Sequence, residues 1–276
     1  MNIDAIATLP VQKIQAGELF TADDMLAIEE PLEIQVLHGM DRQLRKISVT
    51  MRTPGHDAAL AAGFLFTEGI LRHPGEIEQI IPVSLGANVA TVVLKPGVQP
   101  LLQKTERNFY TTSSCGVCGK ASIDAIKTVS AFDNLSDDLH VTPAVLHGLQ
   151  TQLLEQQAVF AHTGGLHASA LFDRTGKLLM VREDVGRHNA LDKLIGAQWL
   201  DDQLPLNNHI LLLSGRASFE LIQKAAMAGI RIIAAVGAPS SLAVSLAREY
   251  KMSLIGFLRT DRFNIYCGGE RIELGH

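Results

Sequence analysis

Short apolar runs alternate with helix-length segments over the last third of the chain. The runs 210–213, 230–236 and 253–258 are apolar almost throughout, and helices are predicted between them, at 217–228 and from about 241 to 250. Strands that are apolar on both faces and separated by helices are typical of a parallel sheet covered on both sides. Right-handed crossovers would bring the loops that follow these strands to one edge of the sheet.

The pattern upstream is different. Residues 33–37 and 46–51 alternate between apolar and polar positions, with Gly39–Asp41 as the turn, which predicts a hairpin. A short helix capped by Asp57 should follow, and 88–94 reads as another strand. This part therefore predicts α+β structure built on antiparallel pairs.

Between these regions, Thr142 and Pro143 mark a helix start, and the helix should run to about Ala158. Segments 168–172 and 177–182 flank a polar turn and predict a second hairpin. The expected fold class is α/β, a layered mixed sheet with helices on both faces, plus a smaller N-terminal α+β part. The expected divisions are a lead-in at 1–30 without firm periodicity, the α+β part at 31–110, and the α/β domain at 111–276.

Composition narrows the class of protein. The chain has 276 residues, 47% of them hydrophobic and 5% aromatic, with a formal net charge of −5. This balance argues against a sequence-independent nucleic-acid surface. No apolar run reaches the roughly 18 residues of a membrane span, and residues 1–10 lack the basic start of a secretory signal. Three cysteines do not form a disulfide scaffold, so a reducing cytoplasm is the expected location and no membrane partner is expected.

The motif Cys115-Gly-Val-Cys118-Gly is the centre of the candidate chemistry. Ser113 or Ser114 could cap the helix that an apolar face predicts after it; that face comprises Val117, Ala121, Ala125, Val129 and Phe132. Thiols at the positive end of a helix dipole are biased toward the nucleophilic thiolate. Three interpretations stay open on spacing alone. They are reactive sulfur, half of a zinc site that would need further ligands besides Cys267, and inert buried thiols.

Two loops at the predicted sheet edge suit an anion. Ser214–Ser218 and Gly237–Ser241 offer small residues and hydroxyls at helix starts, where backbone amides can bind phosphate, and Arg216 and Lys224 could add charge. Ordinary helix capping explains either loop taken alone. Neither loop matches a Walker motif or a dinucleotide fingerprint.

Two further polar runs can each be explained either by an ordinary structural role or by ligand binding. The densest, Arg182–Asn189, lies between a predicted strand and helix, and its acidic residues would suit a helix start. Two arginines, a histidine and an asparagine beside them suggest that it holds an anionic ligand or tunes a thiol. Phe257–Arg262 ends the last predicted strand and is either a surface turn or an anion clamp with bidentate guanidinium groups. His162 and His167 flank a Gly-Gly turn and are interpreted as structural.

Taken together, four motifs resemble the FdhD family of formate dehydrogenase accessory sulfurtransferases. They are Ser114–Gly119, His162–His167, Arg182–Lys193 and Ser214–Glu220, in that order, within a resemblance that covers about residues 30–270. The long run at 182–193 is the specific part, because a CxxC pair occurs in many unrelated proteins.

The resemblance implies a sulfur shuttle. A cysteine desulfurase would load Cys115 as a persulfide, with Cys118 as its partner, and the sulfur would pass to the molybdenum or tungsten of a bis(molybdopterin guanine dinucleotide) cofactor for formate dehydrogenase. The stretch that matches the family's cofactor site consists of Phe257, Leu258, Arg259, Thr260, Asp261 and Arg262. The other candidate contacts are Ser214, Gly215, Arg216 and His188.

The resemblance also implies a fold like that of cytidine deaminases, a guanine nucleotide such as GDP in the position of the deaminase substrate, and a homodimer. The chain lacks the HxE and PCxxC pair of zinc deaminases, so no metal ligands are assigned. Two rival functions stay open, a non-enzymatic chaperone for the cofactor or for immature dehydrogenase, and a zinc nucleotide deaminase relative.

Overall fold

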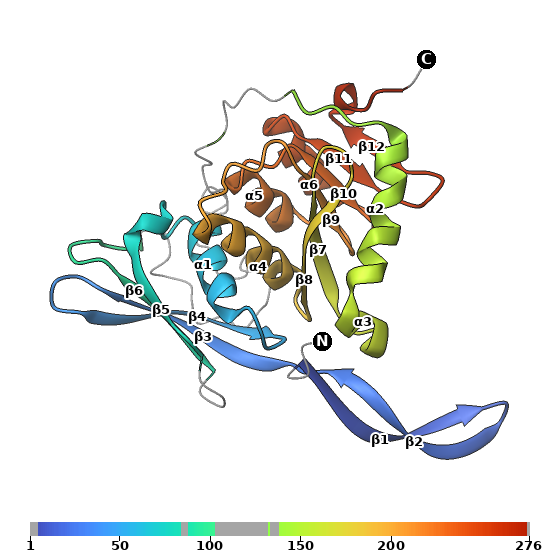
Figure 1. The fold of residues 1–276 in the computed structure, drawn as a ribbon, viewed down its shortest axis with the longest axis horizontal. Helices are drawn as coiled ribbons and strands as arrows, with labels where there is room; N and C mark the ends of the chain where they lie inside the picture. The colour runs from blue at the N-terminus through green and yellow to red at the C-terminus, as the bar shows by residue number, and fades with distance from the viewer. Residues whose placement is uncertain (1–4, 84–87, 103–131, 133–137, 275–276) are drawn as a thin grey trace.

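The structure is a computed structural model that describes residues 5–83, 88–102, 132 and 138–274. Its strands form a six-stranded sheet, a four-stranded sheet and a two-stranded ribbon, and helices cover the largest sheet (Figure 1). Cys115, Cys118 and nearly all of the helix predicted after them lie outside the described residues.

The six-stranded sheet is mixed. Its order is β12-β11-β10-β9-β7-β8, built from β7 (His167–Phe172), β8 (Leu178–Asp184), β9 (Ile210–Leu213), β10 (Ile232–Ala235), β11 (Ser253–Gly256) and β12 (Asn264–Cys267). Strands β9, β10 and β11 are parallel, as the sequence predicts. The predicted hairpin β7–β8 joins the same sheet through an antiparallel pairing of β7 with β9.

Helices lie on both faces of this sheet, as predicted. Helix α2 (Pro143–Gln156) covers one face, and α4 (Arg187–Leu200), α5 (Phe219–Met227) and α6 (Ser241–Glu249) cover the other (Figure 1). Strand residues alternate between two apolar clusters, because successive side chains of a strand point to opposite faces. Ala168, Ala170 and Phe172 pack on the α2 side, whereas Leu171 packs on the opposite side.

The four-stranded sheet differs from its prediction in one pairing. Its order is β4-β3-β6-β5, built from β3 (Glu30–His38), β4 (Gln43–Arg52), β5 (Ile77–Ile81) and β6 (Val89–Leu94). The expected antiparallel hairpin β3–β4 forms, but β3 and β6 are parallel, so the expectation of purely antiparallel pairs is wrong. The reason is that helix α1 (Asp57–Thr67) lies between these strands in the chain and supplies the crossover that a parallel pair needs.

The lead-in is not irregular. Strands β1 (Ile6–Gln15) and β2 (Glu18–Ala27) form a ten-pair antiparallel ribbon that projects from the body (Figure 1). Ala16 and Gly17 both have positive φ, 53° and 89°, as a two-residue type I′ turn requires. The weak alternation of the sequence hid this hairpin, because apolar side chains occur on both of its faces.

Two predicted helix boundaries need correction. Asp57 does not cap α1; the N-cap is His56, and Asp57 instead accepts hydrogen bonds from the Nε and Nη2 of buried Arg52, at 2.9 and 3.2 Å. Helix α2 ends at Gln156, and a second helix, α3 (Ala158–Thr163), begins at once. The Glu183 carboxylate accepts hydrogen bonds from the first amides of α3 and so caps this helix from β8.

Helices α1 and α4 cross with their backbones in contact. A methyl group added to Gly63 would overlap the backbone oxygen of Asp192, and one added to Gly196 would overlap that of Ala59. The apolar cluster around this crossing extends from the four-stranded sheet through α1 and α4 to the six-stranded sheet, without a break. The two sheets are therefore joined by one core.

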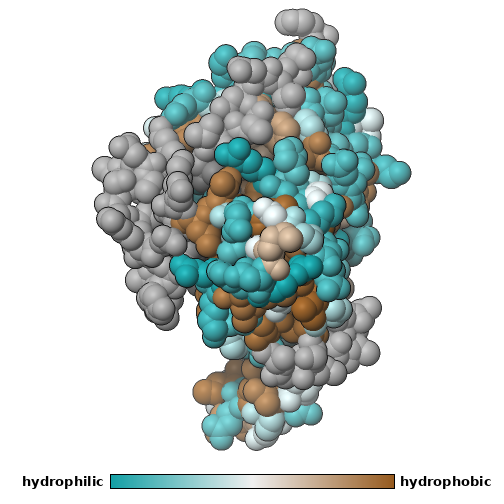
Figure 2. Space-filling model, turned by 90° about the vertical axis from the view of Figure 1, so that its left-hand side faces the viewer, coloured by the Kyte–Doolittle hydropathy of each residue, from teal (hydrophilic) through white to brown (hydrophobic). Residues whose placement is uncertain are grey.

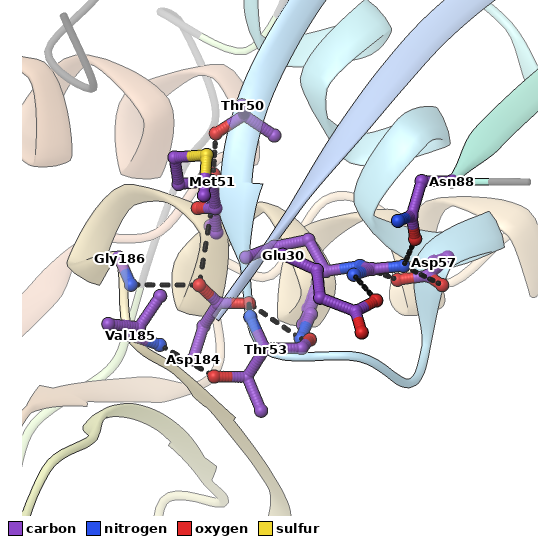
Figure 3. Close-up of polar contacts among 12 residues, drawn as sticks. Glu30, Thr50, Met51, Thr53, Asp57, Asn88, Asp184, Val185 and Gly186 are labelled. Atoms are coloured by element: carbon purple, nitrogen blue, oxygen red, sulfur yellow. Dashed lines mark hydrogen bonds and ion pairs between the residues drawn. The ribbon is translucent and has the colours of Figure 1, made fainter. Parts of the chain in front are cut away.

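A buried polar network reinforces this junction (Figure 3). Asp184, at the end of β8, accepts a hydrogen bond from the Thr53 amide at 3.2 Å and pairs with the Lys193 ammonium at 2.7 Å. Asn189 donates to the Met51 carbonyl at 2.7 Å and accepts from the Thr50 hydroxyl at 3.1 Å. Asp184, Asn189 and Lys193 thus tie α4 to the end of β4, so the interpretation of this motif as a ligand site does not hold for these three residues.

We predict that Gly196→Ala will destabilise the protein by about 3 kcal/mol or more, because the new methyl group has no space between two backbones. Gly148→Ala in α2 is the matched control. Its added methyl group would meet nothing closer than 4.0 Å, so stability should rise by about 0.5–1 kcal/mol. Urea unfolding followed by circular dichroism measures both changes. A Gly196→Ala protein as stable as the Gly148→Ala control would contradict the close crossing.

Candidate functional site: the carboxyl edge of the large sheet

The loops after the three parallel strands interlock at one edge of the sheet. These loops are 214–218 after β9, 236–240 after β10 and 257–262 after β11. The Gly237 amide donates to the Gly215 carbonyl at 2.9 Å, and the Phe257 amide donates to the Gly237 carbonyl at 3.1 Å. The edge is therefore one connected surface, and it includes all the candidate cofactor contacts except His188.

Two glycines allow this close approach. A Cβ at Gly237 would lie 3.0 Å from the Arg216 amide nitrogen, and a Cβ at Gly215 would lie 3.2 Å from His167 Nδ1. A side chain at Gly237 would require the Ser214–Ser218 loop to move, and a side chain at Gly215 would require the His167 ring to shift slightly. Gly215, one of the candidate contacts, thus packs against the His167 ring of β7.

The two helix starts behave differently. At α6, the Ser240 hydroxyl accepts a hydrogen bond from the Ala243 amide at 3.2 Å, which is ordinary capping. At α5, Ser218 is the N-cap residue but makes no such bond, and its hydroxyl lies 3.4 Å from His188 Nε2.

Lys224, expected to add charge at this edge, is buried and pairs with Asp192 at 2.9 Å, so that expectation is wrong.

His188 and Glu220 form a polar pair at the start of α5. His188 is buried, and its Nε2 lies 3.9 Å from Glu220 Oε2. The pKa of Glu220 is lowered to about 2, mainly because the His188 imidazole stands beside its carboxylate. His188 therefore contacts the Ser214–Ser218 loop from the protein interior, through the Ser218 hydroxyl, and its position is that of a residue that supports this loop.

The segment 257–262, after β11, contains both buried and exposed side chains. Arg259 donates from Nη1 to the carbonyls of Val236 and Leu258, and its own carbonyl accepts from His147 Nδ1 on α2 at 3.0 Å. Leu258 is fully buried, whereas Thr260, Asp261 and Arg262 are exposed. One of the two arginines expected to clamp an anion thus fixes the loop, and the other faces solvent.

Phe257 has an unusual backbone. Its φ is 53°, in the left-handed region that bulky side chains rarely adopt, and 42% of its surface is exposed. A strained backbone that presents an aromatic ring to solvent is a common feature of ligand-binding sites.

A pocket of about 410 Å³ opens beside this edge, under α2 and α3. Ser214 and Val236, the first residues after β9 and β10, form its floor together with His167. Most of the remaining wall is apolar or glycine and comes from α2, α3 and the turn after α3: Leu153, Leu154, Phe160, Gly164, Gly165 and Leu166, with Gln150 and Gln157.

The side chains of His167 and Gln157 are two polar groups that line the pocket. Burial is the main cause that lowers the pKa of His167, and the nearby Arg187 and His188 lower it further, which favours the neutral ring. Gln157 is 3% exposed, and its Nε2 has no hydrogen-bond partner among the described residues.

The structure brings most predicted site residues together. Ser214, Gly215, Arg216 and the segment 257–262 lie along one edge, and His188 lies just beneath it. Gln157 and His147 were missed by sequence reasoning, since no local signal distinguishes a buried glutamine or a helix histidine that meets a distant loop. Within the described part of the chain, no group of three or more His, Cys, Asp or Glu residues is arranged to hold a metal ion, and no helix could span a membrane.

We predict that Glu220→Gln will make the free energy of unfolding less dependent on pH in the acidic range. The folded-state pKa of Glu220, about 2, lies below its usual 4.5, so its contribution is complete above pH 4.5 and is lost as pH falls from 4.5 toward 2. Because His188 Nε2 and Glu220 Oε2 are 3.9 Å apart and the Glu220 side chain is partly exposed, we expect the free energy of unfolding to fall by about 1–3 kcal/mol. Urea midpoints measured from pH 2.5 to 6 test this, and equal slopes in both proteins would contradict it.

Comparison with known proteins now gives the family. A sequence model of the FdhD/NarQ family matches residues 27–273. A Streptomyces coelicolor protein named sulfur carrier protein FdhD is 50% identical over 274 residues, covering 96% of this chain and 94% of that relative. A protein of the same name from Mycobacterium tuberculosis is 49% identical, covering 97% of this chain and 99% of that relative.

A solved structure agrees with the fold. The crystal structure of a protein described as a formate dehydrogenase accessory protein from Desulfotalea psychrophila superimposes with a TM-score of 0.74 at 24% identity, covering 98% of this chain and all of that one. At this identity the likeness speaks for the fold alone. The family match and the close relatives confirm the resemblance drawn from the four motifs, and this chain belongs to the FdhD/NarQ family.

Proposed function

We propose that this chain is a sulfur carrier that serves formate dehydrogenase. The observation that carries the proposal is near-full-length identity of about one half to relatives named sulfur carrier proteins, in a chain that has the dithiol Cys115 and Cys118. A reactive dithiol is the interpretation of the CxxC motif that agrees with that name.

The proposed chemistry uses both thiols. The Cys115 thiolate attacks the outer sulfur of a persulfide on a cysteine desulfurase, so that the desulfurase thiolate leaves and Cys115 carries the added sulfur. Cys118 then attacks the inner sulfur of this persulfide. A Cys115–Cys118 disulfide forms and the outer sulfur leaves as hydrosulfide, so two thiols are oxidised while the transferred sulfur is reduced.

The proposed substrate is the bis(molybdopterin guanine dinucleotide) form of the molybdenum cofactor. The carboxyl edge supports this choice through its chemistry. Arg216 and Arg262 are exposed in loops at this edge and suit pyrophosphate oxygens. The exposed ring of Phe257 suits stacking on a flat heterocycle. GDP, which has the guanine and pyrophosphate of the cofactor, is the corresponding simple probe.

Further features come with the proposal. The partners are a cysteine desulfurase and formate dehydrogenase, the location is the cytoplasm, and the active form is a homodimer. A likeness of the large domain to cytidine deaminases belongs with the same proposal. The mixed sheet with helices on both faces is compatible with that architecture.

We predict that Cys115→Ala will abolish persulfide formation. Wild-type protein incubated with a cysteine desulfurase and cysteine should gain the mass of one sulfur atom on Cys115, measured by mass spectrometry of intact protein and peptides. The same variant should fail to restore formate dehydrogenase activity in a strain that lacks its own sulfur carrier. Cys118→Ala should still accept sulfur but transfer it poorly.

Cys267→Ala is the matched control. This third cysteine is half-buried, and its thiol donates to the Met252 carbonyl at 3.4 Å, so its loss should leave both readouts unchanged. Normal dehydrogenase activity with Cys115→Ala would replace the proposal by a cofactor-holding chaperone that uses no sulfur chemistry.

We predict that Arg262→Ala will weaken GDP binding by about 10–100-fold, the effect of losing one charge-assisted hydrogen bond to phosphate. Arg174→Ala is the control, because Arg174 is also exposed but lies in the β7–β8 turn, at the opposite edge of the sheet. Isothermal titration calorimetry measures both. Equal affinities for the two variants would remove Arg262 from the site.

A further inference from the structure

The ribbon of β1 and β2 lacks the support that such a structure normally needs. Within the described residues its strands pair only with each other, over ten residues each. Its base is held by a small apolar cluster that joins Ile6 and Ala27 to Val159 and Leu166. A two-stranded hairpin is marginally stable alone in water, whereas a third strand or a covering surface stabilises it.

The free part of the ribbon exposes apolar side chains. Ile14 is 76% exposed and Leu19, directly opposite it, is 63% exposed; Leu9, Phe20, Met25 and Leu26 are exposed as well. The ribbon is the lowest part of the molecule in Figures 1 and 2, and Figure 2 shows hydrophobic and hydrophilic residues side by side there. Several large exposed apolar side chains gathered on one thin ribbon and rimmed by polar ones make it a candidate interaction surface.

The two edges of the ribbon differ in their capacity to pair. Gln15 and Glu18 close the two-residue turn and form a hydrogen-bonded pair, so every second residue from there points its amide outward. Pro10 occupies such an outward position on β1 and has no amide hydrogen to offer, which blunts that edge. The outward positions of β2 are Leu19, Thr21, Asp23, Met25 and Ala27, all with an amide hydrogen.

The open edge is acidic. Strand β2 carries Glu18, Asp23 and Asp24 and no basic side chain. Lys13, the one basic residue of β1, is engaged with Asp24 at 3.0 Å. An incoming strand that carries lysine or arginine between apolar residues would therefore match both the charge and the apolar surface.

We propose that the outer edge of β2 is a docking site for an extended segment of a partner protein, one that alternates apolar and basic residues and adds a third strand to the ribbon. Main-chain hydrogen bonds to β2 supply affinity, and the carboxylates select the basic partner. The base of the ribbon touches the turn that lines the pocket, since Ala27 lies 3.8 Å from the Cβ position of Gly165. A partner held there stands next to the carboxyl edge.

Synthetic peptides test the proposal. The probes are fluorescent ten-residue peptides that alternate valine or isoleucine with lysine, and matched peptides with glutamate in place of lysine. Fluorescence anisotropy with the full chain should show binding of the lysine peptides and at least tenfold weaker binding of the glutamate peptides. Asp23→Lys should reverse this preference while leaving the backbone edge intact.

A pair of proline substitutions separates the two edges. Thr21 and Gln12 face each other in the register, and both point their amides outward. Thr21→Pro blocks the β2 edge and should weaken lysine-peptide binding at least tenfold, whereas Gln12→Pro affects only the blunted edge and should leave it unchanged. Equal losses in the two variants would mean that the ribbon merely unfolds, and this outcome would overturn edge pairing.

Other occupants give different results. If sedimentation equilibrium shows a wild-type dimer that Thr21→Pro converts to a monomer, a second copy covers the edge and the proposal is overturned. Sedimentation of the wild-type chain with phosphatidylcholine vesicles, lost in Leu19→Ser, would overturn it in favour of a lipid surface. The absence of binding by every lysine peptide would overturn it as well.

Discussion

The contact between the backbones of α1 and α4 is the constraint on which the rest of the structure depends. Gly63 and Gly196 let the two helices touch, and a Cβ added to Gly63 would overlap the carbonyl oxygen of Asp192. Asp192 and Lys193 are adjacent in α4, and both are buried with ion-pair partners. Asp192 meets Lys224 of α5, and Lys193 meets Asp184 of β8. The close crossing therefore places two charged groups where only other protein groups can solvate them.

Burial of charge makes this junction specific. Burial raises the pKa of Asp184 and of Asp192, and the paired lysines work against that rise. Such pairs add little net stability compared with an apolar core, but removing one partner leaves a charge without compensation. A shifted helix would separate these pairs, so the network favours one placement of α4. Since α4 begins at Arg187, the same placement sets His188 under the loop of the carboxyl edge.

The sequence predicted what depends on local patterns. The apolar runs of β9, β10 and β11 and the turn of β3–β4 needed only period and turn chemistry, and the Thr-Pro start of α2 was equally local. The parallel pairing of β3 with β6 and the use of Glu183 to cap α3 depend on partners far away in the chain. The motif at 182–193 shows the limit most clearly. A dense polar run looks the same whether it binds a ligand or, like Asp184, the Thr53 amide 131 residues away.

Positions where local rules are broken without internal compensation are candidates for functional or strained sites. The network around Asp184 is polar, but its groups have hydrogen-bond and ion-pair partners within the chain, so no ligand is needed to explain it. In contrast, Phe257 holds a strained backbone with an exposed ring, and the Nε2 of Gln157 lacks a partner among the described residues. These exceptions are connected, because Val236 lines the pocket of Gln157 and its carbonyl accepts a hydrogen bond from Arg259. Turn residues Gly164 to Leu166 continue from this pocket to the ribbon base at Ala27. A substrate at the edge and a protein on the ribbon would thus share one contiguous surface of the molecule.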